Sequence, residues 1–342
     1  MVELNGKKIL VTFLMHLGDL TLTTPFIHAL RKAAPDARIT MLVDEKLKDV
    51  VLFNPYLDEV VTIDKKGRDN SILSLWACSR HLSKLDFDVL INLHPNERCS
   101  FIDAMTSVKL RTGTTHKIFK WFWDVFTPLD RSMHAADMYL DVLQQLGVQD
   151  LSNNGLEIFP GEEHFLEAEL FWQEQNITDQ DKLIGFNIGS AVPTKRWPLE
   201  RFADVADIFA AKGYKTVFFG GPMDEEMVAK ATGYMQTRPI IATGHFAIGG
   251  LAAAMRRCCL IITNDSGPMH VAISQKVPIV AMYGPSNPKL YGPYTKDAVI
   301  VTAQPPCQGC ADGMKHSCDD LQCMSRMTVE QVVAAADTML NK

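Results

Sequence analysis

The stretch KLIGFNIGSAVPTKRWPLERFADVADIFAAKGYKTVFFGG, residues 182–221, contains one complete strand–helix–strand unit. The apolar run at 182–189 predicts a strand that is buried on both faces. Residues 198–213 carry apolar side chains at helical spacing and end on a glycine, which predicts an amphipathic helix with a stop signal. A second apolar run at 215–221 predicts the next strand. Units of this kind favour a parallel sheet with right-handed crossovers.

The same alternation continues on both sides of this stretch. Further apolar runs predict strands at 7–14, 38–43, 88–93, 239–244, 260–265 and 278–284. Helical patterns are predicted at 71–84, 224–235, 249–257, 267–275 and 328–340, the last with a capping box of Thr328 and Gln331. A further helix is predicted to start at Thr24-Pro25, with the Thr24 hydroxyl as its cap and proline in the first turn. Residues 15–23 are predicted to be a loop. We therefore expect an α/β protein with two doubly wound parallel sheets, divided where the rhythm breaks at Pro160-Gly161.

Length and charge narrow the class of protein. A chain of 342 residues suggests about two domains of ~150 residues each. No apolar run approaches the roughly 20 residues that span a bilayer, and the first residues lack the pattern of a secretory signal, so we expect a cytoplasmic protein. The net charge of -6 argues against a general nucleic-acid binder. Two stretches of the first half are nevertheless basic, at 65–68 and 109–120.

The first strand leads into a loop that carries Gly18 and Asp19. In open parallel sheets, ligands bind at the carboxyl ends of the strands, so this loop is a candidate site. The glycine fingerprint of dinucleotide-binding proteins is absent, which argues against a nicotinamide dehydrogenase. Asp19 either caps the following helix or acts as a general base at the edge of a cleft.

The loop at 187–198 follows a strand of the second half. Gly189 and Ser190 stand where a backbone anion-binding nest would form, and Lys195 could neutralise a phosphate as a point charge. The alternative is a solvated basic loop in which Trp197 packs as an anchor.

Two further loops of the second half follow strands. The loop at 218–226 has two glycines and then Asp224, Glu225 and Glu226, which either accept hydrogen bonds from a ribose or favour the first turn of a helix. In TNDSGPMH (263–270), the backbone N–H groups of Ser266 and Gly267 form a ready anion site at a helix start. Asp265 beside them would suit a sugar hydroxyl or a cation. His270, one turn on, is either near this site or a hydrogen-bonded core histidine.

Together these loops resemble the bacterial ADP-heptose:lipopolysaccharide heptosyltransferases of glycosyltransferase family 9. The resemblance is carried by Asp19, KRWP (195–198), GGPMDEE (220–226), TNDSGPMH (263–270) and YGPSNP (283–288). The loop SAVPTKRWP (190–198) is closer to the second core heptosyltransferase than to the first. The resemblance implies a GT-B fold, in which two Rossmann-like domains face a central cleft. It implies an acceptor-binding domain at 1–160, with the helix at 328–342 packing back on it, and a donor-binding domain at 161–327.

The family implies an inverting, metal-independent glycosyltransferase that needs no cofactor. By position, Asp19 matches the proposed catalytic base, and Lys195 matches the lysine on the donor phosphates. The matching donor-binding positions are Gly189, Ser190, Thr194, Glu225, Asp265, Ser266, Gly267 and His270. The acceptor-binding positions that we predict are Gly18, Arg68 and Lys117. A related GT-B enzyme with another nucleotide-sugar, or a non-catalytic nucleotide-binding protein, are the alternatives.

The implied partners are ADP-heptose and an anionic, lipid-linked acceptor of the lipopolysaccharide core, with no nucleic acid. The basic stretch at 109–120 runs into the aromatic segment 118–126, which suits an acceptor pocket or a contact with the inner face of the inner membrane. The alternative, which we favour for Trp121, Phe122 and Trp123, is that these aromatic side chains belong to the core.

Four cysteines cluster late in the chain, at Cys307, Cys310, Cys318 and Cys323. Their spacing fits a four-thiolate zinc site only loosely. A buried thiol cluster, a disulfide and a metal clip all stay open, although a cytosolic compartment argues against stable disulfides. We expect these cysteines to have no catalytic role.

Overall fold

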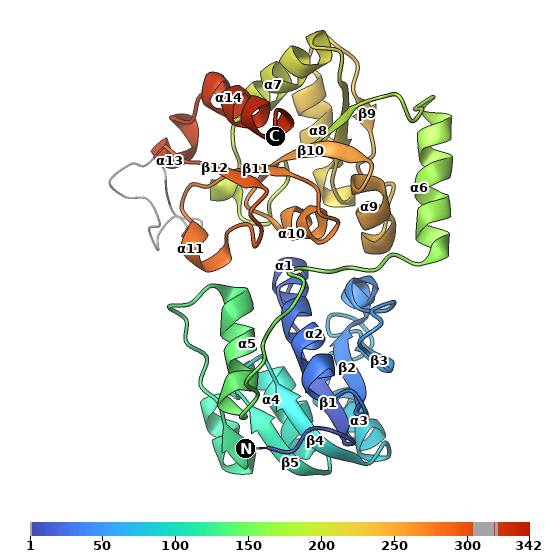
Figure 1. Cartoon of the computed structure of the whole chain (residues 1–342), viewed down its shortest axis with the longest axis vertical. Coiled ribbons are helices and arrows are strands. Elements are labelled where there is room, and N and C mark those ends of the chain that lie inside the picture. The colour runs from blue at the N-terminus through green and yellow to red at the C-terminus, as the bar shows by residue number, and fades with distance from the viewer. Residues whose placement is uncertain (1, 304–317, 319–320) are drawn as a thin grey trace. The chain divides into compact units, whose positions relative to one another are not determined.

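A computed structural model describes residues 2–303, 318 and 321–342 of the chain (Figure 1). The chain forms two compact units, Met1–Phe159 and Pro160–Lys342. The division lies next to the Pro160-Gly161 break of the strand–helix rhythm. Among the residues that the structure describes, no helix has the length and apolar character needed to cross a bilayer.

The first unit is built around a parallel sheet with the strand order β3-β2-β1-β4-β5-β6. Its strands are β1 (Lys8–Thr12), β2 (Arg38–Asp44), β3 (Glu59–Ile63), β4 (Phe87–Asn92), β5 (Val108–Gly113) and β6 (Val125–Phe126). Its helices are α1 (Leu17–Thr21), α2 (Thr24–Ala33), η1 (Glu45–Val50), α3 (Ile72–Ser83), α4 (Glu97–Met105), η2 (Lys117–Phe122) and α5 (Ala135–Gln145).

Helices cover both faces of this sheet. On one face, α3 and α4 contact each other and pack on Leu10, Leu42 and Leu90. The neighbouring residues of these strands point the other way, because side chains alternate along a strand. That second face is covered by α2 and α5, which also contact each other. Both faces are therefore buried, which explains why the strands read as continuous apolar runs.

The second unit repeats the arrangement, with the strand order β12-β11-β10-β7-β8-β9. Its strands are β7 (Leu183–Asn187), β8 (Lys215–Phe219), β9 (Ile240–Ile241), β10 (Cys258–Asn264), β11 (Ile279–Met282) and β12 (Ala298–Val301). Its helices are α6 (Glu162–Glu174), η3 (Pro193–Lys195), α7 (Leu199–Ala211), η4 (Pro222–Asp224), α8 (Glu225–Thr232), α9 (Ile248–Met255), α10 (Gly267–Ser274), α11 (Pro288–Tyr291), α13 (Gln322–Ser325) and α14 (Val329–Leu340). Two Rossmann-like sheets confirm the predicted α/β fold class.

The last helix, α14, begins at the predicted capping box, since the Thr328 hydroxyl accepts a hydrogen bond from the backbone N–H of Gln331. It contacts α7 and the strands β10, β11 and β12. Its buried side chains Val332, Ala336 and Met339 belong to the core of the second unit. This apolar face is therefore used within the second unit, and packing of the same helix on the first unit remains a prediction.

Two local expectations were wrong. The predicted loop at 15–23 contains a short helix, α1, of 5 residues, whose single turn is too brief to show a helical period. Thr24 was expected to cap α2 through its hydroxyl. Its hydroxyl instead donates to the carbonyl of Thr21 and accepts from the backbone N–H of Glu157, so that it ties the helix start to the end of the first unit.

Candidate active site

Both sheets have a topological switch point, where the chain reverses its direction of strand addition. In the first unit this point lies between β1 and β4, and in the second between β7 and β10. The loops that leave adjacent strands in opposite directions form a crevice at the carboxyl edge, where sheets of this type bind ligands.

A buried ion pair occupies the edge of the second unit. The Lys195 ammonium lies 2.7 Å from Oδ2 of Asp265, and these side chains are only 14% and 7% exposed. Lys195 ends the short helix η3, and Asp265 directly follows β10. The hydroxyl of Ser286, after β11, donates to the same carboxylate oxygen at 2.5 Å. Three loops thus meet at one carboxylate, which is the most buried charge of this edge.

The loop after β7 is fixed around this pair by backbone contacts. The Ser190 hydroxyl donates to the carbonyl of Asp265 at 3.3 Å. The guanidinium of Arg196 donates twice to the carbonyl of Ser190, at 2.9 and 2.6 Å. The Trp197 side chain is 1% exposed, and its indole N–H donates to the carbonyl of Met327 at 3.1 Å. Trp197 is therefore an anchor, as one alternative expected, whereas Lys195 is not a solvated lysine.

Side-chain amides join the two central strands at their ends. Asn187 donates to the hydroxyls of Thr263 and Ser266, at 3.0 and 2.8 Å. Asn264 donates to the carbonyl of Ile188 at 2.7 Å and accepts from the backbone N–H of Trp197 at 3.0 Å. Sequence reasoning missed these amides, although polar residues at the ends of two buried strands were the signal.

Helix α10 starts directly beside this network. Ser266 is its N-cap residue; no hydrogen bond from its side chain caps the helix, and its hydroxyl instead accepts a hydrogen bond from Asn187. Gly267 is the first helical residue, and His270 is 4% exposed in the next turn. The partial positive charge of a helix start thus lies next to the Lys195 ammonium, an arrangement that attracts an anion.

The acids after β8 take two different positions. The carboxylate of Asp224 accepts the backbone N–H of Gly221 at 2.9 Å. It also covers Gly189, where an added Cβ would lie only 2.4 Å from Oδ1 of Asp224, so a larger residue at this position would displace the Asp224 carboxylate. Glu225 instead covers Gly244, after β9. Asp224, rather than the predicted Glu225, therefore adjoins the loop after β7.

Tyr283, which follows β11, lies next to the Asp265 carboxylate. Its hydroxyl donates to the carbonyl of Tyr291 at 2.8 Å. Burial raises the pKa of this phenol well above its ordinary value, and the nearby Asp265 carboxylate raises it further. Tyr283 is therefore a neutral hydrogen-bonding group next to the ion pair.

At the carboxyl edge of the first unit, Gly18 and Asp19 lie in the first turn of α1 and are partly buried. The loop that leads into this helix is fixed by Lys65. Its ammonium donates to the carbonyls of Leu14 and Met15, at 2.8 and 2.9 Å, and lies 3.1 Å from the carboxylate of Asp44. Lys65 was noticed only as part of a basic stretch, yet its side chain is 13% exposed.

A histidine lies on the other side of this switch point. His94 follows β4, is 8% exposed and contacts the ring of Phe13, with 5.6 Å between ring centroids. Burial lowers the pKa of His94 to about 4, with further contributions from Lys65 and His16. The imidazole is therefore neutral at physiological pH. Sequence reasoning did not select His94, although it follows the strand that pairs with β1.

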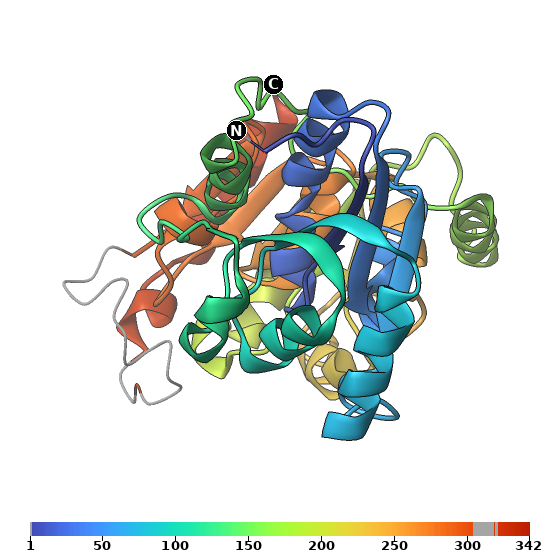
Figure 2. The same cartoon turned by 90° about the horizontal axis from the view of Figure 1, so that it is seen from below.

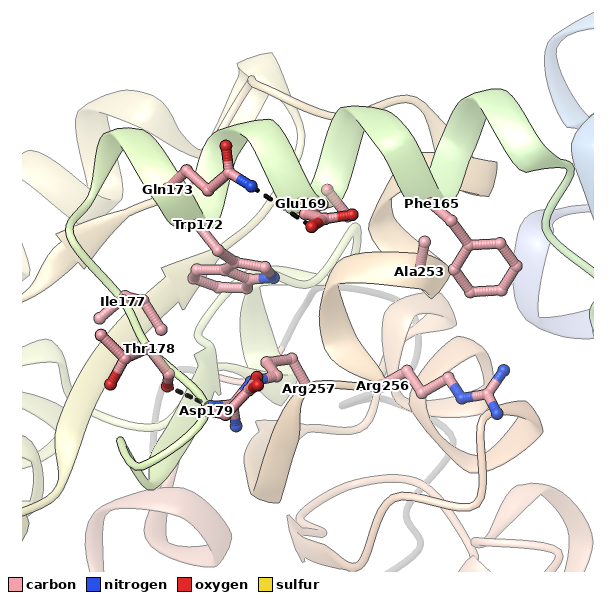
Figure 3. A pocket seen from close by; sticks show the side chains of 11 residues that line it. Phe165, Glu169, Trp172, Gln173, Ile177, Thr178, Asp179, Ala253, Arg256 and Arg257 are labelled. Atoms are coloured by element: carbon pink, nitrogen blue, oxygen red, sulfur yellow. Dashed lines mark hydrogen bonds between the residues drawn. The ribbon is translucent and has the colours of Figure 1, made fainter.

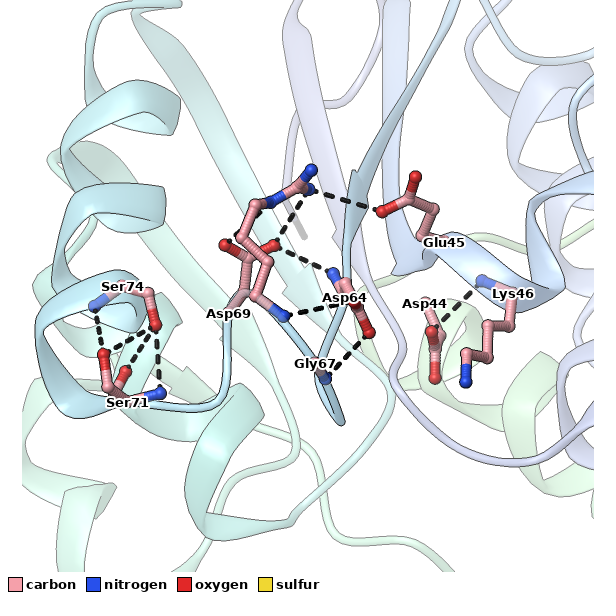
Figure 4. Close-up of polar contacts among 9 residues, drawn as sticks. Asp44, Glu45, Lys46, Asp64, Gly67, Asp69, Ser71 and Ser74 are labelled. Atoms are coloured by element: carbon pink, nitrogen blue, oxygen red, sulfur yellow. Dashed lines mark hydrogen bonds and ion pairs between the residues drawn. The ribbon is translucent and has the colours of Figure 1, made fainter.

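Two of the predicted acceptor-binding residues lie away from these contacts. Arg68 is in the exposed loop after β3 and pairs with Glu45 at 3.3 Å and with Asp69 at 3.1 Å. Figure 4 shows how Asp64 and Asp69 organise this loop through its backbone N–H groups. Lys117 is exposed at the start of η2. Their role in acceptor binding remains a prediction.

Within the described part of the chain, no group of three or more His, Cys, Asp or Glu side chains is placed to hold a metal ion. Cys307 and Cys310 lie outside the described residues. Cys318 is partly exposed, and Cys323 is buried in the core of the second unit.

A cavity of about 740 Å³ lies elsewhere in the second unit (Figure 3). Its walls include Trp172 of α6 and the arginines Arg256 and Arg257, which directly precede β10. Ile177 and Thr178, which precede β7, also line it. The cavity is therefore at the amino ends of these strands, on the side of the sheet away from the Lys195–Asp265 pair, and we do not include it in the candidate active site.

Comparison with known proteins identifies the family. Residues 75–318 match the model of "Glycosyltransferase family 9 (heptosyltransferase)". A crystal structure of a family 9 glycosyl transferase from Veillonella parvula is 53% identical, with a TM-score of 0.95, and the match covers 99% of each chain. The structure of ADP-heptose lipopolysaccharide heptosyltransferase II from Escherichia coli has the same fold, with a TM-score of 0.79 at 20% identity over 98% of each chain.

Curated relatives carry related names. Lipopolysaccharide heptosyltransferase 3 of Escherichia coli K12 is 24% identical over 94% of this chain and 95% of its own length. Lipopolysaccharide heptosyltransferase 2 of Salmonella typhimurium is 24% identical over 86% of this chain and 87% of its own. The equal identities do not single out heptosyltransferase II, which stays a prediction. Together with the family match and the two Rossmann-like units, they confirm the resemblance: this chain belongs to glycosyltransferase family 9.

Proposed function

We propose that this glycosyltransferase moves heptose from ADP-heptose to a sugar of the lipopolysaccharide inner core, with inversion at the anomeric carbon and without a metal. Membership of family 9 and the names of the relatives support the class of substrate. The observation that carries the proposal is the Lys195–Asp265 pair at the switch point of the second unit, next to the start of α10. It joins a cation, a helix start and a carboxylate at one edge.

Lys195 and the start of α10 would hold the diphosphate of the donor. During transfer, negative charge grows on the departing ADP, and groups already fixed at that position stabilise it without rearranging. Among the described residues, the Lys195 ammonium donates to a single acceptor, Asp265 Oδ2, at 2.7 Å, so further N–H donors of the ammonium remain for phosphate oxygens. Ser190 and Gly189 would line the same loop, and Thr194 precedes the lysine.

Asp265 and the acids after β8 would recognise sugar hydroxyls. The side chains of Lys195 and Ser286 both contact Oδ2 of Asp265, and the Tyr283 phenol also interacts with this carboxylate. We propose that Oδ1 accepts a hydroxyl of the donor sugar. We keep Glu225 as the predicted ribose acid, with Asp224 as the alternative that adjoins Gly189. His270 would lie one turn behind the phosphates.

Asp19 of the first unit would act as the base. It would accept the proton of the acceptor hydroxyl while that oxygen attacks the anomeric carbon on the face opposite the diphosphate. Its place in α1, behind a loop that Lys65 fixes, suits a group that must be held in position. Gly18, Arg68 and Lys117 would contact the acceptor. The acceptor is an anionic, lipid-linked sugar, so we propose that the enzyme works on the cytoplasmic side, at the inner face of the inner membrane.

The proposal is tested by donor choice and by one substitution. The purified chain is mixed with a lipopolysaccharide-core acceptor and with ADP-heptose, UDP-sugars or GDP-sugars, and nucleotide release is measured. We expect release from ADP-heptose alone. Release only from another nucleotide-sugar would favour a different GT-B enzyme, and ADP binding without any transfer would favour a binding protein.

Asp19→Asn should lower kcat about 100- to 10,000-fold while ADP affinity stays unchanged, because a general base contributes that much. The matched control is Asp36→Asn, at an exposed acid of the same unit, which should keep wild-type turnover. A near wild-type kcat for Asp19→Asn would exclude Asp19 as the base.

A further inference from the structure

The first unit leaves two groups of large apolar side chains exposed. One group is on η2, where Ile118, Trp121 and Phe122 are 55%, 87% and 44% exposed. The other is on α3, where Ile72, Leu73 and Trp76 are 72%, 78% and 51% exposed. We call these six residues, with the cations beside them, the α3–η2 face. The structure contradicts our expectation that Trp121 and Phe122 belong to the core. Only Trp123 does, with its indole N–H donating to the carbonyl of Thr112.

The two groups belong to the same layer of the unit. Helix α4 contacts both α3 and η2. The buried side chains of α3 and α4 face the sheet on the side of Leu10 and Leu90, so the exposed side chains of α3 point away from the sheet. Figure 2 shows α3, in light blue, protruding from this unit. The exposed groups therefore flank one helix on an outer surface.

Cations are interleaved with these apolar side chains. Lys117 and Lys120 are exposed on η2, and the Lys120 ammonium lies 4.4 Å from the centroid of the Phe126 ring. On α3, the Arg80 guanidinium lies 5.8 Å from the centroid of the Trp76 indole. Exposed acids nearby are Glu97 and Asp124, and Asp124 already accepts the backbone N–H of Arg111. Since the whole chain has a net charge of -6, this gathering of cations is local.

We propose that the α3–η2 face docks on an anionic phospholipid membrane, an inference that rests on the lipid-linked acceptor of the proposed function. Amphipathic side chains such as Trp, and Lys on a flexible stem, suit the interface, where apolar parts enter the acyl boundary and charges reach the headgroups. Each Lys or Arg near an anionic surface adds a favourable contribution. A protein partner fits less well, because the cores of protein interfaces are depleted of lysine, whereas here the cations lie among the exposed aromatics.

The test is sedimentation of the full chain with vesicles of phosphatidylcholine alone or with phosphatidylglycerol added. We expect binding only to the anionic vesicles, weakened by salt. Trp121→Ala with Phe122→Ala should lower vesicle binding at least tenfold. The matched control is Leu166→Ala with Leu170→Ala, which removes exposed apolar side chains from α6 of the second unit and should leave binding unchanged.

The charge contribution is tested separately. Arg80→Gln with Lys120→Gln should weaken binding about fivefold for each lost cation and flatten its salt dependence. Lys215→Gln with Lys230→Gln, at exposed lysines of the second unit, is the control and should change neither. Vesicle binding of the aromatic variant equal to wild type would overturn the proposal. So would a wild-type dimer that this variant dissociates, because a second copy would then cover the face.

Activity on a deacylated, water-soluble acceptor distinguishes this inference from the proposed function. The Trp121→Ala/Phe122→Ala variant should retain wild-type turnover on that acceptor, which also shows that it is folded, and lose turnover on the lipid-linked acceptor in vesicles. If the chain binds anionic vesicles through this face but transfers no heptose, the docking surface stands and the proposed function fails. If it transfers heptose to both acceptors equally in the variant and in wild type, the docking surface fails alone.

Discussion

At both switch points a threonine of one central strand lies opposite an asparagine of the other, but the two Thr–Asn pairs make different contacts. In the first sheet, Thr12 of β1 is in register with Asn92 of β4, and in the second, Asn187 of β7 is in register with Thr263 of β10. In the second pair, the Asn187 amide donates to the hydroxyl of Thr263 and to the hydroxyl of Ser266, at the start of α10. In the first pair, Thr12 donates to the buried carboxyl of Asp103 at 2.8 Å, and Asn92 accepts the backbone N–H of His94. The second pair therefore fixes the start of α10, whereas the first pair is tied to Asp103 of α4 and to the loop after β4.

The two buried lysines at these edges, Lys65 and Lys195, also differ in how many acceptors they contact within their own unit. Lys65 contacts two carbonyls and the carboxylate of Asp44, so its three N–H donors all have acceptors within the unit. Lys195 has one acceptor, Asp265, among the described residues. Lys65 therefore fixes a backbone loop of the first unit, whereas Lys195 has further N–H donors, which we propose bind the donor phosphates. The following substitutions test this difference.

Lys195→Met should have the largest effect, on activity. Removing a cation that stabilises the charge developing on the leaving group costs about a thousandfold in turnover. Steady-state kinetics with ADP-heptose would measure it, and Lys215→Met, at an exposed lysine of the same unit, should leave turnover unchanged. Adding Asp265→Asn should restore the stability lost by leaving that carboxylate unpaired, without restoring activity. Turnover that survives Lys195→Met would remove the distinction between the two lysines.

Lys65→Met should act mainly on stability. It leaves the buried carboxylate of Asp44 without its cation, and breaking a buried pair in this way costs roughly 4 kcal/mol of the free energy of unfolding. Urea unfolding would measure the loss. Unlike Asp265→Asn in the second unit, Asp44→Asn should restore only part of it, because the carbonyls of Leu14 and Met15 still lack a donor. Full recovery in the double variant would show that the two lysines have the same role.

The sequence predicted the sheets better than it predicted these contacts. The strand–helix alternation is a local property of the chain, so the central strands and most long helices of both units were predicted from periodicity. The strand β6 is only two residues long and was not predicted, whereas β9, which is equally short, lies within the strand predicted at 239–244. Lys195 and Asp265 were selected because they follow strands in recognisable loops. That they form an ion pair across 70 positions is a property of the fold.

Lys65 and His94 were missed for the same physical reason. A lysine in a basic stretch is usually solvated, and nothing near Lys65 in sequence supplies the carbonyls and the carboxylate that surround it. These acceptors lie 51, 50 and 21 positions away, on the loop after β1 and at the end of β2. The tryptophans of η2 and its end show the opposite case, in which identical side chains take different positions. Trp121 is exposed and Trp123 is buried, so residue type alone could not distinguish them.

His94→Gln should have the smallest effect, confined to low pH. The pKa of His94 falls from 6.5 to about 4 on folding, chiefly because the imidazole is buried. Below pH 6.5 the unfolded chain therefore binds a proton that the folded chain does not, and wild-type stability falls as the pH decreases toward 4. A shift of this size corresponds to about 3 kcal/mol over that window. Above pH 6.5 His94 is neutral in both states and contributes no pH dependence.

Urea unfolding at several pH values between 4 and 7 would measure this effect. The glutamine does not titrate, so the His94→Gln variant should lose that part of the slope while its stability at pH 7 changes little. The matched control, His81→Gln, replaces an exposed histidine of the same unit and should leave the wild-type slope unchanged, because solvent surrounds its ring in both states. An unchanged slope in His94→Gln would mean that the pKa of His94 is the same in the folded and the unfolded chain, so that the imidazole becomes protonated in the fold below about pH 6.5. Below that pH it would place a second cation beside Lys65, and the first edge would resemble the edge of the second unit where we propose that the donor phosphates bind.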